Sequence, residues 1–328
     1  MMSSCPVPDE PPGCPRKPHT LPSDIIYDIA REHIHNKKTL TRLALTCRHY
    51  YELLDPLLYK LEVLEIRRRA LKDTYFQIGD GKWGSLYIDN TTVLRWGILP
   101  YFHKGVSNLT VVKKCIKAAL RYWPEYLLVR AYEHRTTMTP LHLAAKYGLD
   151  SVANELVKVY PFIDVETKFP NAVASLSGLP LRRFMAFEPY ISQFIATPLH
   201  VAMIYGHVHV AEILARHTQV LEDEDRDDDS VYDDCSMLSP FSLAAMCKMP
   251  SVIRILQSRG YKVAEISEYH GEFFNPCHFA ASNDNNEEVL GLLIAGGHDH
   301  KAAATDGSMV RPIGIAIEFE CASNALFG

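Results

Sequence analysis

The chain has 328 residues, of which 47% are hydrophobic and 22% are charged, and its formal net charge is −5. These are the values of ordinary globular proteins, and the length allows two domains or one elongated one. The negative balance excludes a strongly basic nucleic-acid binder, and no apolar run is long enough for a membrane span. We therefore expect neither a nucleic-acid partner nor a membrane.

The N-terminus and the cysteines bear on the compartment. Residues 1–18 hold six prolines and no apolar core segment, which predicts a disordered tail rather than a secretory signal. The eight cysteines are scattered without a C-x-x-C pair, a pattern that favours reduced thiols over a disulfide framework. We expect an intracellular protein of the cytoplasm or the nucleus.

Residues 19–60 predict a module of three short helices. Ser23 is the expected N-cap of the first helix, whose isoleucines recur at helical spacing. Residues 37–39 (Lys-Lys-Thr) predict a break, and a second apolar face runs from Leu40 toward Pro56. A module this small needs a partner or a docked neighbour to be stable.

Residues 61–91 predict a connector that is partly helical. Arg67, Arg68 and Arg69 follow an apolar stretch and predict the solvated face of a helix. The glycines 79, 81 and 84 fit G-x-G-x-x-G, but no helical pattern follows them and no acidic residue lies twenty positions on, so a turn is the better interpretation.

From residue 92 to residue 328 the chain repeats itself. TPLH occurs at Thr139 and again at Thr197, and weaker copies begin near residues 92, 239, 275 and 311. The prolines of the last five copies are 58, 42, 36 and 36 residues apart. T-P-L-H-x-A at this period is the signature of the ankyrin repeat, and this part of the chain resembles that family.

The motif also has a direct physical meaning. Its threonine is a good helix N-cap, its proline suits the first helical position, its leucine supplies an apolar face, and its histidine can hydrogen-bond backbone between stacked units. Serine, histidine and glycine follow at the histidine's position in later copies, which indicates a structural role rather than catalysis. The residues of the two full copies are Thr139, Pro140, Leu141, His142, Thr197, Pro198, Leu199 and His200.

The predicted fold class is therefore all-α, a three-helix module followed by an ankyrin α-solenoid with hairpin loops. The long intervals leave room for inserts near 162–194 and 221–234. Arg182 and Arg183 in the first insert, and Asp227, Asp228 and Asp229 in the second, are candidates for partner binding. Packing is an equal alternative for the first insert, and a solvated loop is favoured for the second. The last copy is short, which indicates either an atypical cap or a truncated chain.

Residues 21–60 resemble an F-box. The resemblance rests on the opening Leu-Pro, the isoleucines of the first helix, LTRLALTCR and the closing LLDPLLY, whereas His49-Tyr50 departs from the usual residues. An F-box implies a Skp-type adaptor as partner and, through it, a cullin–RING ubiquitin ligase. The residues implied to form that contact, or the helices that present it, are Leu21, Pro22, Ile25, Ile26, Ile29, Leu40, Leu43, Cys47 and Arg48.

Together the two resemblances imply the substrate-recognition subunit of such a ligase, similar to F-box/ankyrin proteins of filamentous fungi. The alternatives are a plain ankyrin scaffold whose N-terminal helices serve as a cap, and an enzyme with the solenoid as an accessory. No catalytic motif and no cofactor motif occurs, and we expect a non-enzymatic adaptor. His298-Asp299-His300 lacks a third metal ligand at a telling distance and predicts a surface loop.

Overall fold

The computed structural model describes residues 21–34, 36–72, 87–88, 94, 98, 109–128, 130–133, 136–159, 196–218, 239–261, 267–269, 272–302 and 311–318. The expected tail, the 79–84 glycine motif and both inserts, with Arg182, Arg183 and Asp227–Asp229, lie outside these residues. The chain divides into two compact units, Met1–Leu61 and Glu62–Gly328.

The first unit contains α1 (Ser23–His33), α2 (Lys37–Ala44) and the beginning of α3 (Arg48–Lys72). Its core consists of Ile26, Ala30, Leu40, Ala44, Leu54 and Leu57. Two apolar residues one helical turn apart on α1, with two more on α2, meet the first turns of α3, so three short helices enclose one small core.

The helix starts differ from two of our predictions. The expected N-cap Ser23 is the first residue of α1, and Pro22 holds the cap position without a side-chain hydrogen bond. α2 starts at Lys37 and is capped by Asn36, whose side chain accepts a hydrogen bond from the Lys38 N–H at 2.8 Å. α3 continues through Pro56 to Lys72, and Arg67–Arg69 on its last turns are exposed.

The second unit is built from pairs of short antiparallel helices. These are α6 (Pro140–Lys146) with α7 (Asp150–Val159), α9 (Pro198–Ile204) with α10 (Val208–Ala215), α11 (Pro240–Met246) with α12 (Pro250–Ser258), and α13 (Pro276–Ala281) with α14 (Glu287–Ala295). α5 (Leu109–Tyr122) packs on α7, and α15 (Pro312–Glu318) packs on α13.

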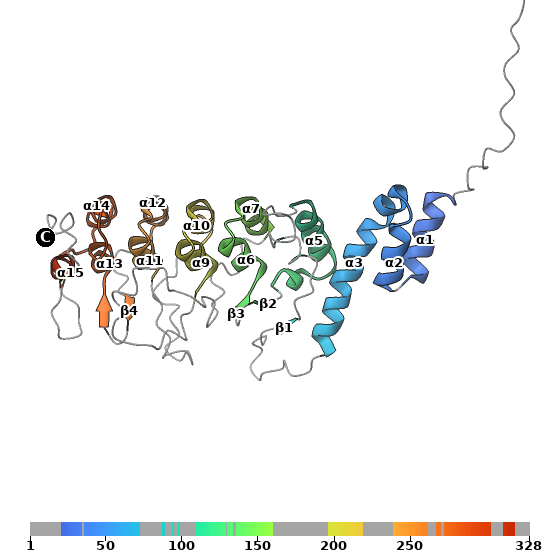
Figure 1. Cartoon of the computed structure of the whole chain (residues 1–328), viewed down its shortest axis with the longest axis horizontal. Helices are drawn as coiled ribbons and strands as arrows, with labels where there is room; N and C mark the ends of the chain where they lie inside the picture. Colours follow the sequence, from blue (N-terminus) through green and yellow to red (C-terminus); the bar gives the residue numbers. More distant parts are fainter. Residues whose placement is uncertain are drawn as a thin grey trace, which may run out of the picture. The chain divides into compact units, whose positions relative to one another are not determined.

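Contacts between pairs divide the helices of this unit into two rows. α6, α9, α11, α13 and α15 follow one another in one row, and α5, α7, α10, α12 and α14 follow one another in the second (Figure 1). Alanines at the helix contacts are fully buried, such as Ala144 and Ala145 of α6 and Ala244 and Ala245 of α11. Small side chains there allow neighbouring backbones to approach closely.

Short strands precede two of the first-row helices. β2 (Arg130–Glu133) and β3 (Thr136–Met138) form an antiparallel hairpin before α6, and β1 (Tyr87–Ile88) pairs with β2 in parallel. β4 (Ser267–Tyr269) and β5 (Glu272–Phe274) form a second hairpin before α13. Among the described residues, the strands are these two hairpins and the two-residue β1, and the predicted all-α solenoid with hairpin loops is confirmed. No helix among the described residues is long and apolar enough to cross a membrane.

Candidate protein-binding surfaces

The first helix of the N-terminal unit carries apolar side chains on its solvent side. Leu21, Ile25 and Ile29 are exposed by 55%, 44% and 44%, although Ile26 and Ala30 of the same segment are buried. The four-residue spacing places Ile25 and Ile29 along one stripe of α1, and Leu21 lies two residues before the first residue of the helix. The unit therefore has a complete core and, in addition, an apolar stripe that its own helices leave uncovered.

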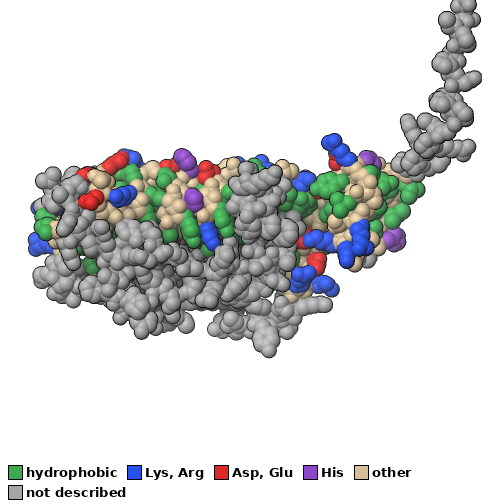
Figure 2. Space-filling view, in the orientation of Figure 1, with side chains coloured by type: hydrophobic (Ala, Val, Ile, Leu, Met, Phe, Trp, Pro, Cys, Tyr) green, Lys and Arg blue, Asp and Glu red, His purple; other side chains and the backbone are tan. Residues whose placement is uncertain are grey.

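Further exposed apolar residues lie near the start of α3. Leu45 and Tyr51 are also exposed, and five of the nine large hydrophobic side chains exposed among the described residues belong to this unit. The Ser23 hydroxyl and His49 Nε2 are 2.7 Å apart, which brings the start of α1 beside the start of α3. Figure 2 shows hydrophobic side chains over much of the visible face of these helices, with basic side chains at its edges.

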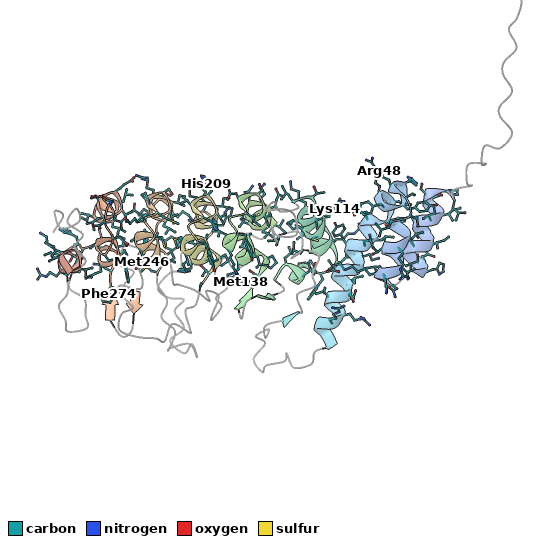
Figure 3. All side chains as sticks on the ribbon, in the orientation of Figure 1. Arg48, Lys114, Met138, His209, Met246 and Phe274 are labelled. Carbon is teal, nitrogen blue, oxygen red and sulfur yellow. The ribbon has the colours of Figure 1, made fainter. Side chains whose placement is uncertain are left out.

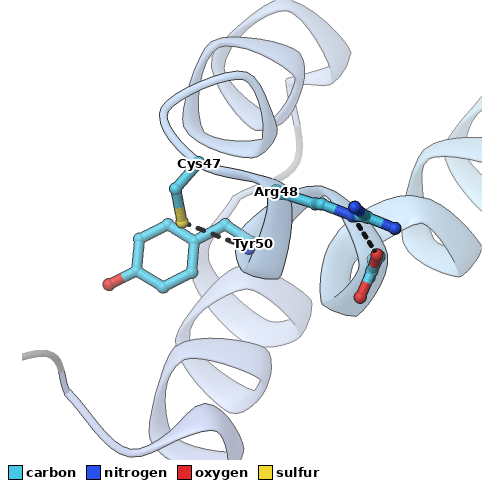
Figure 4. Close-up of polar contacts among 4 residues, drawn as sticks. Cys47, Arg48 and Tyr50 are labelled. Atoms are coloured by element: carbon cyan, nitrogen blue, oxygen red, sulfur yellow. Dashed lines mark hydrogen bonds and ion pairs between the residues drawn. The ribbon is translucent and has the colours of Figure 1, made fainter.

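The start of α3 combines a thiol with an exposed cation. The Cys47 Sγ accepts a hydrogen bond from the Tyr50 N–H at 3.4 Å, so the thiol caps the first turn of α3 (Figure 4). The Arg48 side chain extends into solvent (Figure 3), where its Nε donates to Glu52 Oε1 at 2.9 Å. An exposed pair one helical turn apart contributes little to stability, so Arg48 remains available to a partner.

The structure divides the nine residues that the F-box resemblance singled out. Exposed are Leu21, Pro22, Ile25, Ile29, Cys47 and Arg48. Ile26 and Leu40 lie in the core and hold the helices in place, and Leu43 packs partly against this core.

In the repeats, the TPLH threonine and histidine form one hydrogen-bonded unit. Thr139 caps α6, because its hydroxyl oxygen accepts from the His142 N–H, and its hydroxyl lies 2.7 Å from His142 Nδ1. His142 Nε2 donates to the carbonyl of Ala196 at 3.2 Å, immediately before the cap residue of the next pair. Since a carbonyl only accepts, Nε2 carries a proton. The side chain is fully buried, and its two ring nitrogens are engaged by the Thr139 hydroxyl and the Ala196 carbonyl.

The other copies vary this arrangement. The Thr197 N–H donates to His200 Nδ1 at 3.2 Å, which closes a capping box on α9. In α11 the Ser239 hydroxyl donates to the Ser242 oxygen at 3.0 Å, so serine replaces the local bond. None of these side chains is arranged as an acid, a base or a nucleophile.

Polar side chains of the helix turns also join neighbouring pairs, and sequence reasoning missed them. His207 Nε2 donates to the Lys146 carbonyl at 2.9 Å, and Asn283 Nδ2 donates to the Met246 carbonyl at 3.2 Å. Asn286 Nδ2 donates both to Ala245 of the preceding pair, at 2.9 Å, and to Ala280 of its own, at 3.0 Å. Each bond ends on a backbone carbonyl in the last turn of a first-row helix.

The predicted surface loop at His298–His300 is wrong for its first residue. His298 is only 4% exposed, and its ring packs edge-on against Phe241 with the ring centroids 5.3 Å apart. Burial lowers the pKa of His298 to about 4. Asp299 is exposed as expected. A surface loop was predicted here because the residue that buries His298 lies in a helix more than fifty residues earlier.

Other buried titratable groups stay neutral. Burial raises the pKa of the Cys247 thiol to about 12, and burial with a contribution from Asp299 does the same for Cys277. Among the described residues, no three His, Cys, Asp or Glu side chains are grouped to hold a metal ion.

Near the N-terminal end of the second compact unit, the buried Tyr126 side chain joins three segments of the chain. Tyr126 donates to Glu62 at 3.5 Å and accepts from the Leu94 N–H at 3.4 Å, both in buried surroundings. Burial, followed by the nearby Cys115 and Glu62, raises the pKa of Tyr126 well above its ordinary value. Glu62, the first residue of the second unit, is thus fixed to the first helices of the stack.

Fold and contacts define a class of protein, a solenoid of stacked helix pairs. The family model described as "Ankyrin repeat" matches residues 137–166 and 196–222, which contain both full TPLH copies. No curated protein matches the chain. Among solved structures, the ankyrin repeat domain of Bcl-3, a member of the IκB family, is similar at 19% identity with a TM-score of 0.46, over 72% of this chain and 84% of that one. Ankyrin repeats are therefore present, and they indicate a role in protein–protein interaction.

Proposed function

We propose that this chain is the substrate-recognition subunit of a cullin–RING ubiquitin ligase. In this role the N-terminal unit binds a Skp-type adaptor, and the ankyrin stack binds a protein substrate. The chain then acts by proximity, since it raises the effective concentration of substrate lysines near a ubiquitin-charged enzyme. Ubiquitin transfer itself would be carried out by the partner subunits.

The observation that carries the proposal is the exposure of Ile25 and Ile29 on one stripe of α1, with exposed Leu21 just before the helix. A unit of about sixty residues that leaves such side chains in water is less soluble than one that buries them, and a partner surface removes this disadvantage. Helices that served only as a cap on the stack would bury their apolar faces within the chain, so the stripe favours an external partner over the cap alternative.

Arg48 and Cys47 fit the same surface. Interfaces place apolar anchors at the centre and polar or charged groups at the rim, and arginine is favoured among the latter. The exposed guanidinium at the start of α3 supplies such a rim group, since its carboxylate neighbour Glu52 leaves it accessible to solvent.

The test is to co-express the full chain with a Skp-type adaptor and to purify through a tag on the adaptor. We expect the wild-type chain to copurify, and we expect the double variant Ile25→Ser/Ile29→Ser to be lost from the complex while it stays folded, because both residues are exposed. Leu120→Ser is the matched control. Leu120 is exposed by 49% on α5 of the second unit, so its replacement should leave the complex intact.

Two results would overturn the proposal. One is that a folded wild-type chain forms no complex with the adaptor. The other is a complex that the α1 double variant and the α5 control retain equally, which would place the contact elsewhere. Circular dichroism of each purified variant, with its helical signal compared with that of the wild type, establishes that the chain is folded.

A further inference from the structure

The α13–α14 pair and the turn after it contain buried polar atoms without hydrogen-bond partners. Among the described residues, the buried side-chain nitrogens and oxygens that lack a hydrogen bond are Nδ1 and Nε2 of His298 and Oδ1 of Asn286. All three atoms belong to the segment 286–298. Buried polar groups are nearly always hydrogen-bonded, so two such residues in one repeat are unusual.

His298 occupies a defined place in the repeat. It follows Gly297, whose φ of 93° turns the chain out of α14, and its N–H donates to the Leu293 carbonyl at 3.0 Å. Thr218 and Tyr261 hold the corresponding positions after α10 and α12, and both are buried too. The Thr218 hydroxyl donates to the Leu214 carbonyl at 3.0 Å, whereas the ring nitrogens of His298 have no partner among the described residues.

The ring of His298 contacts the preceding helix pair. Phe241 of α11 is fully buried and stands where the full TPLH copies have leucine, and its ring packs edge-on against both His298 and Tyr261. Removing His298 from this position would therefore expose part of the α11 core. A neutral imidazole is tolerated in such apolar surroundings, whereas an imidazolium without a counter-ion is not.

Among the residues that the structure describes, burial is the cause that moves the pKa of His298, and no charged group counters it. α11 (Pro240–Met246) has no ionisable side chain, and α13 has only the Cys277 thiol and His278. The thiol is neutral, because burial raises its pKa to about 12. The neighbouring Asp299 carboxylate is exposed and accepts from the Lys301 N–H at 2.8 Å. Glu287 and Glu288 lie at the opposite, N-terminal end of α14, and Glu288 is paired with Arg254.

We propose that His298 makes the contact between the α11–α12 pair and the α13–α14 pair acid-labile, so that acidification releases the α13–α14 end of the stack. A partner bound across both pairs would be released with it. This device is independent of the proposed adaptor contact, which lies in the other compact unit.

The direction and size of the pH effect on this contact follow from proton linkage. The pKa of His298 is lowered by burial from 6.5 to about 4, so the open state binds the proton more tightly than the closed state. The contribution to stability is complete above pH 6.5 and is lost as the pH falls toward 4. Between pH 7 and pH 5 the opening equilibrium of this pair should rise about 20-fold through this one group.

Hydrogen exchange at pH 7 and pH 5, corrected for the intrinsic rate at each pH, tests this in the full chain. We expect amides of α13 and α14 to lose about 20-fold in protection at pH 5, by linkage at His298. In His298→Phe and His298→Tyr this additional loss should disappear. The tyrosine variant repeats the residue found after α12, so it remains informative if the phenylalanine variant does not fold.

His209→Gln is the matched control, because the His209 side chain is 81% exposed on α10, and this variant should behave like the wild type. The proposal is overturned if α13 and α14 lose no more protection at pH 5 than α9 and α10 do. It is also overturned if a folded His298 variant keeps the same acid sensitivity as the wild type.

Discussion

Replacing His142 by alanine should weaken the contact between the α6–α7 pair and the α9–α10 pair. The imidazole is fully buried, and its Nε2 is the donor to the Ala196 carbonyl at 3.2 Å. A buried carbonyl left without its donor costs about 1–3 kcal/mol, and the lost bond to the Thr139 hydroxyl adds about 1 kcal/mol. We therefore expect α6 and the start of α9 to lose about 2–4 kcal/mol in their free energy of opening.

Hydrogen exchange is the suitable assay, because solenoids unfold unit by unit and a single melting temperature averages over them. His142→Ser provides a matched variant. It places a serine beside Thr139, as Ser242 stands beside Ser239 in α11, so it should restore the local bond and lose the bond to the Ala196 carbonyl. The free energy of opening of this variant should therefore fall between the values for wild type and alanine. If the alanine variant opened α6 and α9 within about 0.5 kcal/mol of the wild type, as expected of an ordinary surface substitution, the structural role argued for this histidine would be refuted.

Three further predictions concern the turns and the thiols. Gly148→Ala should destabilise the chain more than Gly206→Ala. Both glycines have positive φ, but only at Gly148 would the new Cβ meet a neighbouring histidine ring, at 2.5 Å. Equal losses of unfolding free energy in urea would contradict this prediction. Asn286→Asp should destabilise α13 by about 1–3 kcal/mol, since a carboxylate cannot donate to the Ala245 and Ala280 carbonyls as the amide does, and unchanged exchange of α13 would argue against it. Exposed Cys47 should react with a thiol reagent at pH 8 well before buried Cys277, whose pKa is about 12. Mass spectrometry of the labelled peptides measures the order of reaction, and earlier labelling of Cys277 would contradict the prediction.

The helix pairs were predictable because each motif carries its own local instructions. A threonine or serine cap, a proline at the first helical position and a glycine after the last turn each act within a few residues, as at Thr139, Pro140 and Gly148. The period of the repeat then supplied the order of stacking. Exposure along α1 was only partly predictable, because helical spacing marks Ile25, Ile26 and Ile29 alike and only the packing of α2 and α3 decides that Ile26 is buried.

The contacts between pairs were not predictable, because their partners lie far apart in the chain. Asn286 donates to a carbonyl 41 residues earlier, and one sequence contains no signal that joins the two. His298 was predicted to lie in a surface loop because it follows the second helix of its repeat. The residue that buries it, Phe241, differs from the usual leucine of the motif, and this enlarged side chain was the one available hint.

Equilibrium binding of the purified full-length chain to a purified Skp-type adaptor tests the central proposal most directly. Leu21, Ile25 and Ile29 are exposed at and just before the start of α1. Truncating an apolar anchor in an interface costs about 1 kcal/mol or more each, so replacing all three by serine should weaken binding about 100-fold or more. Saturable binding of the wild-type chain with this loss in the triple variant is the predicted result. No binding by the folded wild-type chain, or the same affinity in both, would contradict the assignment.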